Sequence, residues 1–245
     1  MTLTLTANVS AIGAGLFTYF LASGGTAPYV YSVLPDGAGG TINSSTGKYN
    51  SPASLPDSVQ NTYDTIQVID ATMATATLQI LIGSPLILFC DILQKQLGLA
   101  NDHIYLWDQK LIEPKDYTLY VAVSVLTSKI FGNTNSFDSN TNQSVQSVNM
   151  IDTLQIDAIS RGPQARDKRA NILMALNSQY AEQQQEFNSF YIGKVPTSFI
   201  NLSQIDGAAI PYRFQISVAL QYFVKLRQNV EYYDTFEQPT VLTNP

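Results

Sequence analysis

The sequence predicts two domains, an all-β sandwich over residues 1–82 and an α+β domain over residues 83–236, followed by an extended C-terminal tail over residues 237–245. Three observations support this prediction. Turn clusters recur at short spacing before residue 83, where no helical pattern appears. Charged residues are sparse in the same segment, whose only basic residue is Lys48. The cluster Gly83-Ser84-Pro85 is typical of a break between elements.

Runs rich in Thr, Val, Tyr and Ile make up the first domain, and turn residues separate them. The turn clusters lie at residues 23–28, 35–37, 39–40 and 43–47. The last run is the clearest, because apolar side chains alternate with Thr75, Thr77 and Gln79 between Ala74 and Ile82. Alternation of this kind is typical of a strand with one buried face. Many short strands with frequent turns predict a sandwich.

The second domain begins with a helical pattern. An apolar stripe predicts a short helix over residues 86–97, and Gly98 suits its C-cap. Residues 117–126 predict a strand whose two faces are both apolar, so we expect it to be central and covered on both sides. Residues 132–144 are rich in Asn, Ser and Thr and predict a polar loop. Residues 148–159 predict the next strand.

One long helix is expected to open at Gly162-Pro163, because proline suits the first helical position. Its later residues 182–186 are expected to form a solvated end. Strands are predicted over residues 190–199 and 213–224, and only Phe223 breaks the alternation of the second. These elements predict helices packed on a mainly antiparallel sheet.

Four bases gather at the start of the long helix. They are Arg161, Arg166, Lys168 and Arg169. Two interpretations remain open. A solvated helix face is the commoner one. The other is contact with a neighbouring subunit, because a helix N-terminus favours anions and bases placed there gain from a partner carboxylate.

The composition excludes several classes of protein. With 13 Lys and Arg against 19 Asp and Glu, the net charge of -6 argues against a dedicated nucleic-acid binder. A single cysteine, Cys90, excludes a disulfide within one chain and a multi-cysteine zinc site. A single histidine, His103, excludes sites built on paired histidines. No apolar run predicts a membrane span, and no basic segment precedes the apolar residues 11–22, so we expect a soluble protein in a reducing compartment.

No catalytic set can be assembled from the sequence. Cys90 falls on the apolar side of its predicted helix, which favours a buried hydrophobe. The carboxylates Asp152 and Asp157 are expected on opposite faces of one strand. The glycines at 37–40 lack the strand–turn–helix setting of a dinucleotide loop. We therefore expect no enzyme activity, no catalytic residue, no cofactor and no metal.

Three stretches of the first domain carry a resemblance. They are Ala22–Val33 (ASGGTAPYVYSV), Gly40–Tyr49 (GTINSSTGKY) and Asp64–Ala71 (DTIQVIDA). This pattern resembles the bacterial immunoglobulin-like repeat. The resemblance implies an immunoglobulin-like sandwich for residues 1–82. It implies little about function, because such domains serve as general spacers and binders.

The second domain resembles the neck terminator family of tailed bacteriophages. The segments that carry the resemblance are Leu97–Tyr105, Phe131–Thr134, Gln146–Met150, Ser160–Arg166, Ile172–Ser178, Pro196–Phe199, Ala208–Phe214 and Tyr232–Phe236. The resemblance implies a tail-terminator-like fold and a structural virion protein. Such a protein forms a ring, expected to be a hexamer, that terminates the tail tube and joins the tail to the head-side connector.

The resemblance also implies partners and a location. The partners are further copies of the chain, the tail tube protein, connector proteins and, if the tail is contractile, a sheath protein; genomic DNA passes through the lumen without specific binding. The location is the neck of the virion, after assembly in the host cytoplasm. Besides the four bases, Phe131, Asn133 and Arg213 are candidates for the subunit interface. The polar residues 132–144 and the tail 237–245 are expected to become ordered on a neighbour.

Two alternatives remain. The first is a collar or decoration protein whose immunoglobulin-like domain binds host surface glycans. The second is an enzyme, such as a hydrolase accessory to infection, against which the missing catalytic set argues.

Overall fold

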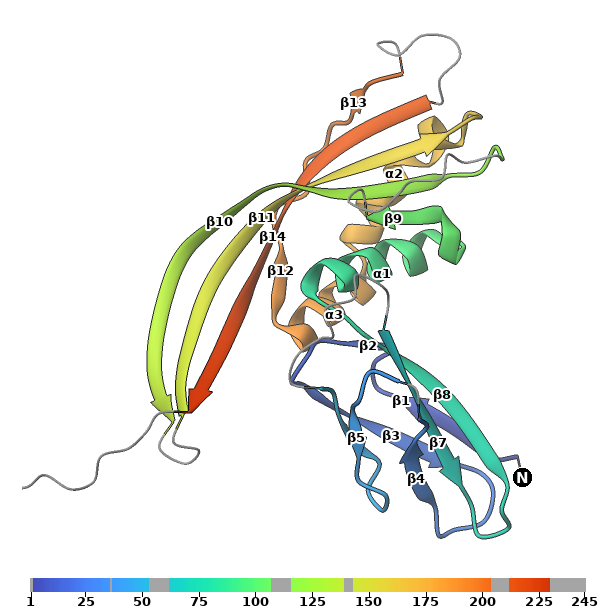
Figure 1. Cartoon of the computed structure of the whole chain (residues 1–245). Coiled ribbons are helices and arrows are strands. Elements are labelled where there is room, and N and C mark those ends of the chain that lie inside the picture. The colour runs from blue at the N-terminus through green and yellow to red at the C-terminus, as the bar shows by residue number, and fades with distance from the viewer. Residues whose placement is uncertain are drawn as a thin grey trace, which may run out of the picture.

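A computed structural model describes residues 2–35, 37–52, 62–106, 116–138, 143–203 and 212–229. Within these residues the chain is mostly β-structure with a few helices (Figure 1). The N-terminal strands form a sandwich, and the later strands form a second, larger sheet covered by helices. The C-terminal tail 237–245 and the segment Tyr232–Phe236 lie outside the described residues, as does most of the segment that begins at Ala208.

The sandwich consists of two four-stranded sheets in the described part of the chain. One has the order β1-β3-β6-β5 and the other β2-β8-β7-β4. The strands are β1 (Thr4–Ala7), β2 (Ala11–Ile12), β3 (Phe17–Ser23), β4 (Val30–Val33), β5 (Thr41–Ile42), β6 (Lys48–Asn50), β7 (Thr62–Ile69) and β8 (Thr75–Ile82). Phe20, Tyr49, Ile66 and Ile80 fill the space between the sheets. The predicted sandwich is confirmed, as is the predicted strand that ends at Ile82.

A buried carboxylate ties the sandwich together. Asp64 on β7 is fully buried and accepts hydrogen bonds from the Tyr49 hydroxyl at 2.5 Å and from the Gly40 amide at 2.8 Å. Burial and the neighbouring Asp64 raise the pKa of Tyr49, so its hydroxyl keeps the proton that it donates. The bond links β6 of one sheet to β7 of the other.

The larger sheet has the order β12-β14-β11-β10-β9, and β13 also pairs with β14. Its strands are β9 (Ile104–Leu106), β10 (Tyr120–Asp138), β11 (Gln143–Ser160), β12 (Phe190–Ile192), β13 (Ile200–Asn201) and β14 (Tyr212–Asn229). All pairs are antiparallel except β9 with β10. Helices α1 (Pro85–Leu97), α2 (Gln164–Leu176) and α3 (Gln179–Asn188) bury apolar side chains against one face of this sheet, and a short 3-10 turn, η1 (Asn101–His103), precedes β9.

Local chemistry explains the limits of α1. The Ser84 hydroxyl accepts a hydrogen bond from the Ile87 amide, and Pro85 occupies the first turn, where its missing N–H costs nothing. At the other end Gly98 has φ 63°, a left-handed conformation that favours glycine. The predicted helix and its C-cap are confirmed.

The prediction of one long helix after Gly162-Pro163 is wrong. The segment forms α2 and α3, which are separated at Asn177 and Ser178. The Asn177 side chain donates to the Leu173 carbonyl, and the Ser178 hydroxyl accepts from the Ala181 amide at 3.1 Å. Both side chains satisfy backbone groups at helix ends, which ends one helix and begins the next.

The predicted polar loop at 132–144 is also wrong for the residues that the structure describes. Residues 132–138 continue β10, and residues 143–144 begin β11. The strand predicted over 190–199 is confined to Phe190–Ile192. Only the start of β10 is covered on both faces: Tyr120 and Ala122 are buried, whereas Leu126 is 50% exposed. The strand predicted over 213–224 is confirmed and extends over the whole of β14.

The sandwich and the sheet domain share apolar contacts. Ala11 and Leu81 belong to the sandwich strands but are buried in the core beneath the helices. Phe187 of α3 packs in turn against the sandwich core. The Gly13 amide donates to the Asn188 side chain at 2.8 Å. In β8 the side chains of Ile80 and Ile82 point into the sandwich core, and Leu81 points to the other face. Leu81 is nevertheless buried, because that face meets the core beneath the helices.

Candidate assembly surface

Three strands of the larger sheet continue beyond the helices and form an arm. We define the arm as residues 126–138 of β10, 143–151 of β11 and 221–229 of β14 (Figure 1). The apolar core beneath the helices includes Val125, Leu154 and Tyr222 at its outer limit, and its described members include no residue farther along β10 or β11. The arm therefore has no helix layer of its own.

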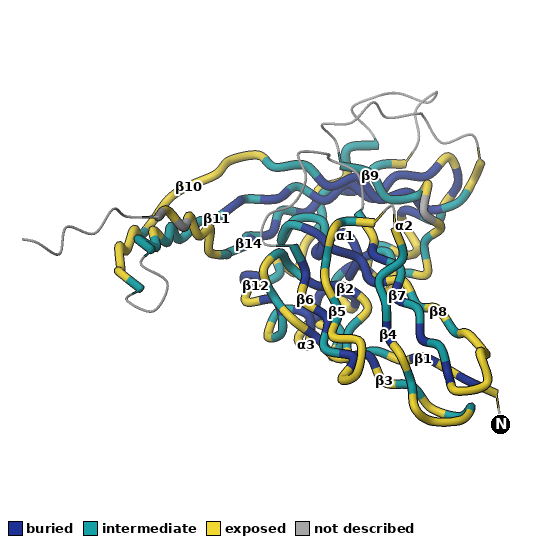
Figure 2. Tube along the Cα trace, turned by 60° about the horizontal axis from the view of Figure 1, so that its bottom comes forward, coloured by how far each residue is buried: buried dark blue, intermediate teal, exposed yellow. Residues whose placement is uncertain are grey.

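Large apolar side chains are exposed along the arm. Phe131 is 57% exposed and Phe137 52%, in contrast to the fully buried Val121 and Val123 of the same strand. The others are Leu126, Ile130, Phe223, Val224 and Leu226. Figure 2 shows the contrast, with dark blue strands in the body and yellow and teal along the arm. Apolar surface gathered on one projecting element is typical of a protein–protein contact.

The arm has two different faces. The strand register places Ile130, Val148 and Leu226 on the side that continues the helix-covered core. The opposite side carries Lys129 and Lys225, and most of its other members are polar: Thr134, Ser136, Ser147, Asn149 and Gln221. The arm is thus amphipathic although neither face is covered by a helix.

Both outer strands of the arm have unpaired edges in the described residues. On the outer side of β10, β9 pairs only with Val121–Val123. On the outer side of β14, β12 reaches no farther than Tyr222 and β13 pairs with Phe214 and Gln215. No described strand pairs with the outer side of β10 from residue 124 to 137 or of β14 from 223 to 228. Long open edges are a liability that proteins cover, charge or pair.

A partly buried hydrogen bond anchors the root of the arm. The Tyr222 hydroxyl of β14 donates to Asp152 Oδ2 of β11 at 2.8 Å. Burial and this carboxylate raise the pKa of Tyr222. Asp152 is 5% exposed, and its Oδ1 has no hydrogen-bond partner among the described residues. Asp157 lies on the opposite face of β11, as predicted.

The candidate interface residues fall into separate groups. Phe131 and Asn133 lie exposed on the arm. The four bases lie at the start of α2, at the other end of β11 from the arm. Arg166 is exposed and forms an ion pair with Asp167 at 3.0 Å, and Lys168 is exposed.

One of the other two bases, Arg169, contacts its own chain. The Arg169 guanidinium lies 5.3 Å from the centre of the Phe214 ring. It also donates to the Arg166 carbonyl. Arg161, which connects β11 to α2, is exposed. The structure thus brings Phe131 and Asn133 together on the arm and keeps the bases apart from them.

Arg213 forms an ion pair within the chain. Its Nε and Nη2 lie 3.1 Å and 2.9 Å from the two carboxylate oxygens of Asp157, which is fully buried. Gln155 Nε2 donates to the same carboxylate at 2.7 Å. This paired geometry gives Arg213 a role in holding β11 and β14 together.

One arrangement that the sequence analysis missed has the order of a catalytic triad. His103 Nδ1 lies 2.7 Å from Asp102, and Nε2 lies 2.8 Å from the Thr118 hydroxyl. The Thr118 hydroxyl, however, donates its proton to Asp116 at 2.7 Å, and this bond holds the pKa of Asp116 below its usual range. His103 therefore donates to Thr118, the reverse of a base that activates a nucleophile. The ring also stacks on Tyr120 at 4.2 Å.

The other reactive side chains of the described residues do not form a catalytic or metal-binding site. Cys90 is buried, and desolvation raises the pKa of its thiol to about 12, which leaves it protonated. In the described ranges no three His, Cys, Asp or Glu side chains gather to hold a metal ion. None of the described helices combines the length and apolar character that a membrane span needs.

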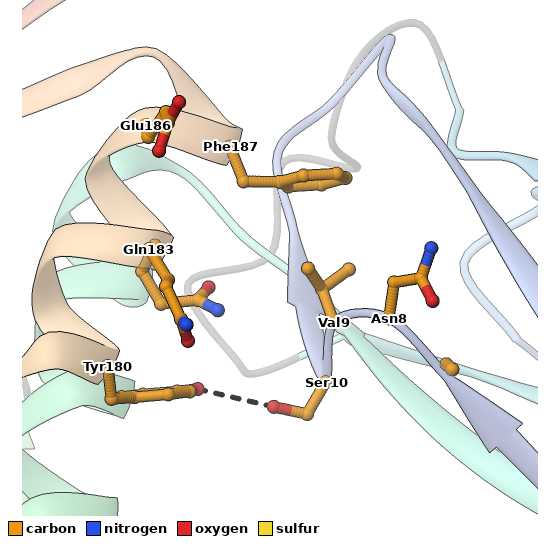
Figure 3. Close-up of a pocket in the computed structure, with 9 residues that line it drawn as sticks. Asn8, Val9, Ser10, Tyr180, Gln183, Glu186 and Phe187 are labelled. Atoms are coloured by element: carbon orange, nitrogen blue, oxygen red, sulfur yellow. Dashed lines mark hydrogen bonds between the residues drawn. The ribbon is translucent and has the colours of Figure 1, made fainter.

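A cavity of about 630 Å³ lies between the sandwich and α3. Figure 3 shows Asn8, Val9 and Ser10 on one side and Tyr180 on the other. Ser10, Tyr180, Lys95 and Asp91 form one connected group, with Lys95 Nζ 2.7 Å from Ser10 Oγ and 2.8 Å from Asp91 Oδ2. Burial lowers the pKa of Lys95, but Asp91 outweighs it and the pKa is raised. These polar groups satisfy one another, as expected at a structural joint.

The comparisons with known proteins identify no family. No family model matches the chain, and no curated protein matches it. Two similar solved structures are those of Protocadherin Gamma B7 extracellular cadherin domains 1-4 and Protocadherin Gamma B2 extracellular cadherin domains 3-6. The first has 14% identity and a TM-score of 0.26, and covers 65% of this chain and 46% of that one. The second has 8% identity and a TM-score of 0.25, and covers 91% and 46%. The chain thus spans about half the length of these structures. Their TM-scores are too low to establish a shared fold.

Proposed function

We propose that the protein is a structural component of a tailed bacteriophage, a ring at the neck that terminates the tail tube and joins the tail to the head-side connector. In this proposal residues 1–82 form an immunoglobulin-like domain and residues 83–236 a tail-terminator-like α+β domain. The ring is a hexamer, its other partners are the tail tube, connector and sheath proteins, and DNA passes through the lumen.

One observation supports the proposal above the others. The arm exposes apolar side chains and two open strand edges, and nothing in the described chain covers them. Sheets commonly protect such edges with charges, bulges or a covering segment. β10 has register shifts at Leu126 and Phe131 and carries Lys129, and β14 carries Lys225, but residues 132–137 of β10 are regularly paired and uncharged. A ring in which each copy contacts the next covers part of both edges at once.

The test is a nonsense mutation of this gene followed by electron microscopy of the lysate. Loss of termination gives full heads beside detached tails of irregular or excessive length. The same lysate complemented with the wild-type gene should contain joined particles. Complete particles without complementation would contradict the neck assignment and favour a collar or decoration protein.

A second observation favours the collar or decoration role. Phe17 and Tyr19 lie exposed on the outer face of β3, edge to face at 6.0 Å, and Lys48 Nζ lies 4.3 Å from the centre of the Phe17 ring. Exposed rings on a sheet can stack on the apolar faces of sugar rings, and the cation can contact their hydroxyl groups.

For this second function we expect the full-length protein to bind bacterial surface glycans through β3. Replacing Phe17 and Tyr19 by alanine should then reduce binding at least about tenfold, the loss of roughly one stacking contact per ring. Tyr63→Ala, a similarly exposed aromatic on the other sheet, serves as the control. Equal binding by both variants, or no binding by the wild-type protein, would contradict the glycan role.

A further inference from the structure

We propose that the arms of neighbouring copies pair edge to edge, β14 of one copy in parallel with β10 of the next, so that the ring closes into a single β-barrel. This inference rests on the proposed function, because it assigns the joint of the proposed ring. In this arrangement the open edges of the arm bind a second copy of this chain.

Strand direction is the first argument. β10 is antiparallel to β11, and β11 is antiparallel to β14, so β10 and β14 both run from the body toward the tip of the arm. Copies related by rotation about an axis along the arms place β14 of one beside β10 of the next, pointing the same way. Parallel strands form a regular ladder.

The alternative joints leave edges open. Pairing β10 with β10, or β14 with β14, needs a two-fold axis and makes an antiparallel dimer. Such a dimer covers one edge of each arm and leaves the other exposed to a further chain. The joint between β14 and β10 uses part of both edges of every copy, because residues 223–228 of β14 are level with residues 132–137 of β10, and rotation closes it.

The two edges also match in level and in chemistry. Asn133, Val148 and Val224 form one row across the arm, so the open edges of β10 and β14 overlap along the arm. Between residues 124 and 137 of β10 the only charged side chain is Lys129. Backbone pairing between copies therefore meets little like-charge repulsion along this edge.

The dimensions suit a channel. Six copies with three strands each give a barrel of about 18 strands, a size that leaves an aqueous channel. With strands about 4.8 Å apart and tilted by about 40°, the backbone wall is about 36 Å across. That width accommodates a DNA duplex after side chains are added.

The two faces of the arm then have assigned directions. The helices and the sandwich lie on one side of the sheet and are too bulky for the inside of the barrel, so the opposite face lines the channel. That face carries Lys129, Thr134, Ser147 and Lys225, together with the apolar Ile151 and Phe223. A few bases among hydroxyl groups attract DNA weakly, which suits passage rather than tight binding.

The test introduces cysteines on the two edges. Asn133→Cys on β10 and Val224→Cys on β14 lie in one row but two strands apart within a copy, about 10 Å, which is too far for a disulfide. The native Cys90 is buried and does not interfere. Leu226→Cys and Gln228→Cys replace Val224→Cys in parallel samples, so that a shift of the joint by two or four residues is also detected.

Oxidation of the double variant at high protein concentration is expected to give a ladder of covalent oligomers that ends at the size of the closed ring. Each single variant should give no disulfide-linked species. A mixture of Asn133→Cys protein with the β14 single variant should give dimers and nothing larger. Native mass spectrometry of the same samples reports assembly independently of the disulfides.

Three results would overturn the inference. Dimers from a single variant would show an antiparallel joint between identical edges. Rings in the mass spectrum without a ladder in any double variant would show that the arms do not form the joint, and the neck function would stand. Monomers throughout would show that the arms do not pair in solution. The nonsense mutant decides the neck function separately.

Discussion

Replacing Asp64 by alanine is expected to lower the free energy of unfolding of the sandwich by about 3–5 kcal/mol. The change removes the acceptor of the Tyr49 hydroxyl and of the Gly40 amide. The fully buried Tyr49 hydroxyl loses its partner in the interior, a loss that costs about 1–3 kcal/mol, and the half-buried Gly40 amide loses its partner as well. The cavity left by the carboxylate adds to this loss.

Chemical denaturation of the full-length protein measures the effect. Asp64→Asn keeps an acceptor oxygen at the same place and should cost clearly less than Asp64→Ala. Tyr49→Phe removes the hydroxyl but leaves the carboxylate bonded to Gly40, and should also cost less. An Asp64→Ala protein that unfolds at the wild-type denaturant concentration would show that the buried carboxylate contributes nothing.

Replacing Arg213 by alanine is expected to destabilise the sheet domain by about 3 kcal/mol, at the lower end for a broken buried pair because the Arg213 side chain is 25% exposed. Of the two side chains that donate to the buried Asp157, only Gln155 then remains. Arg213→Lys retains the charge but loses the two-point geometry, so we expect an intermediate loss.

The readout separates this role from the interface role that the sequence predicts for Arg213. A lower unfolding temperature of the dilute protein, with Asp157→Asn partly restoring it in the double variant, indicates the intramolecular ion pair. An unchanged unfolding temperature with weakened assembly would instead support the subunit contact. Arg166→Ala, whose ion pair with Asp167 is exposed, is the control and should change stability by less than about 1 kcal/mol.

The sequence predicts elements well where one face packs on the chain's own core. The strand ending at Ile82 and the strand over 213–224 alternate visibly because one side of each meets a core. The helix α1 has Ser84 and Gly98 at its ends, residues whose capping geometry is local and therefore readable. The sandwich follows from the same two kinds of signal.

The arm could not be predicted in this way. Residues 132–138 are exposed or half-buried, so their polar side chains match those of a loop although the backbone is a strand. Hydrophobic periodicity reports burial within one chain, and the arm has no layer to bury against. The break between α2 and α3 was missed because the apolar stripe from Ile172 to Tyr180 continues across Ser178.

The interface candidates show the same limit. Arg213 looks like an unpaired base in the sequence because its partner, Asp157, lies 56 residues away. Only the register between β11 and β14 brings the two side chains together. Phe131 and Asn133 were named from a resemblance and prove to lie on the exposed arm, where the open edges could not have been foreseen.

The shared contacts between the sandwich and the helices have a consequence for the shape of the proposed ring. Ala11 and Leu81 are buried under the helices, and the partly buried Phe187 packs against the sandwich core, so the two parts interlock and cannot pivot freely. In a hexamer the six sandwiches would then stand as rigid spokes at one fixed angle. Images averaged with six-fold symmetry should show these spokes as sharply as the hub, whereas a tethered domain would blur away.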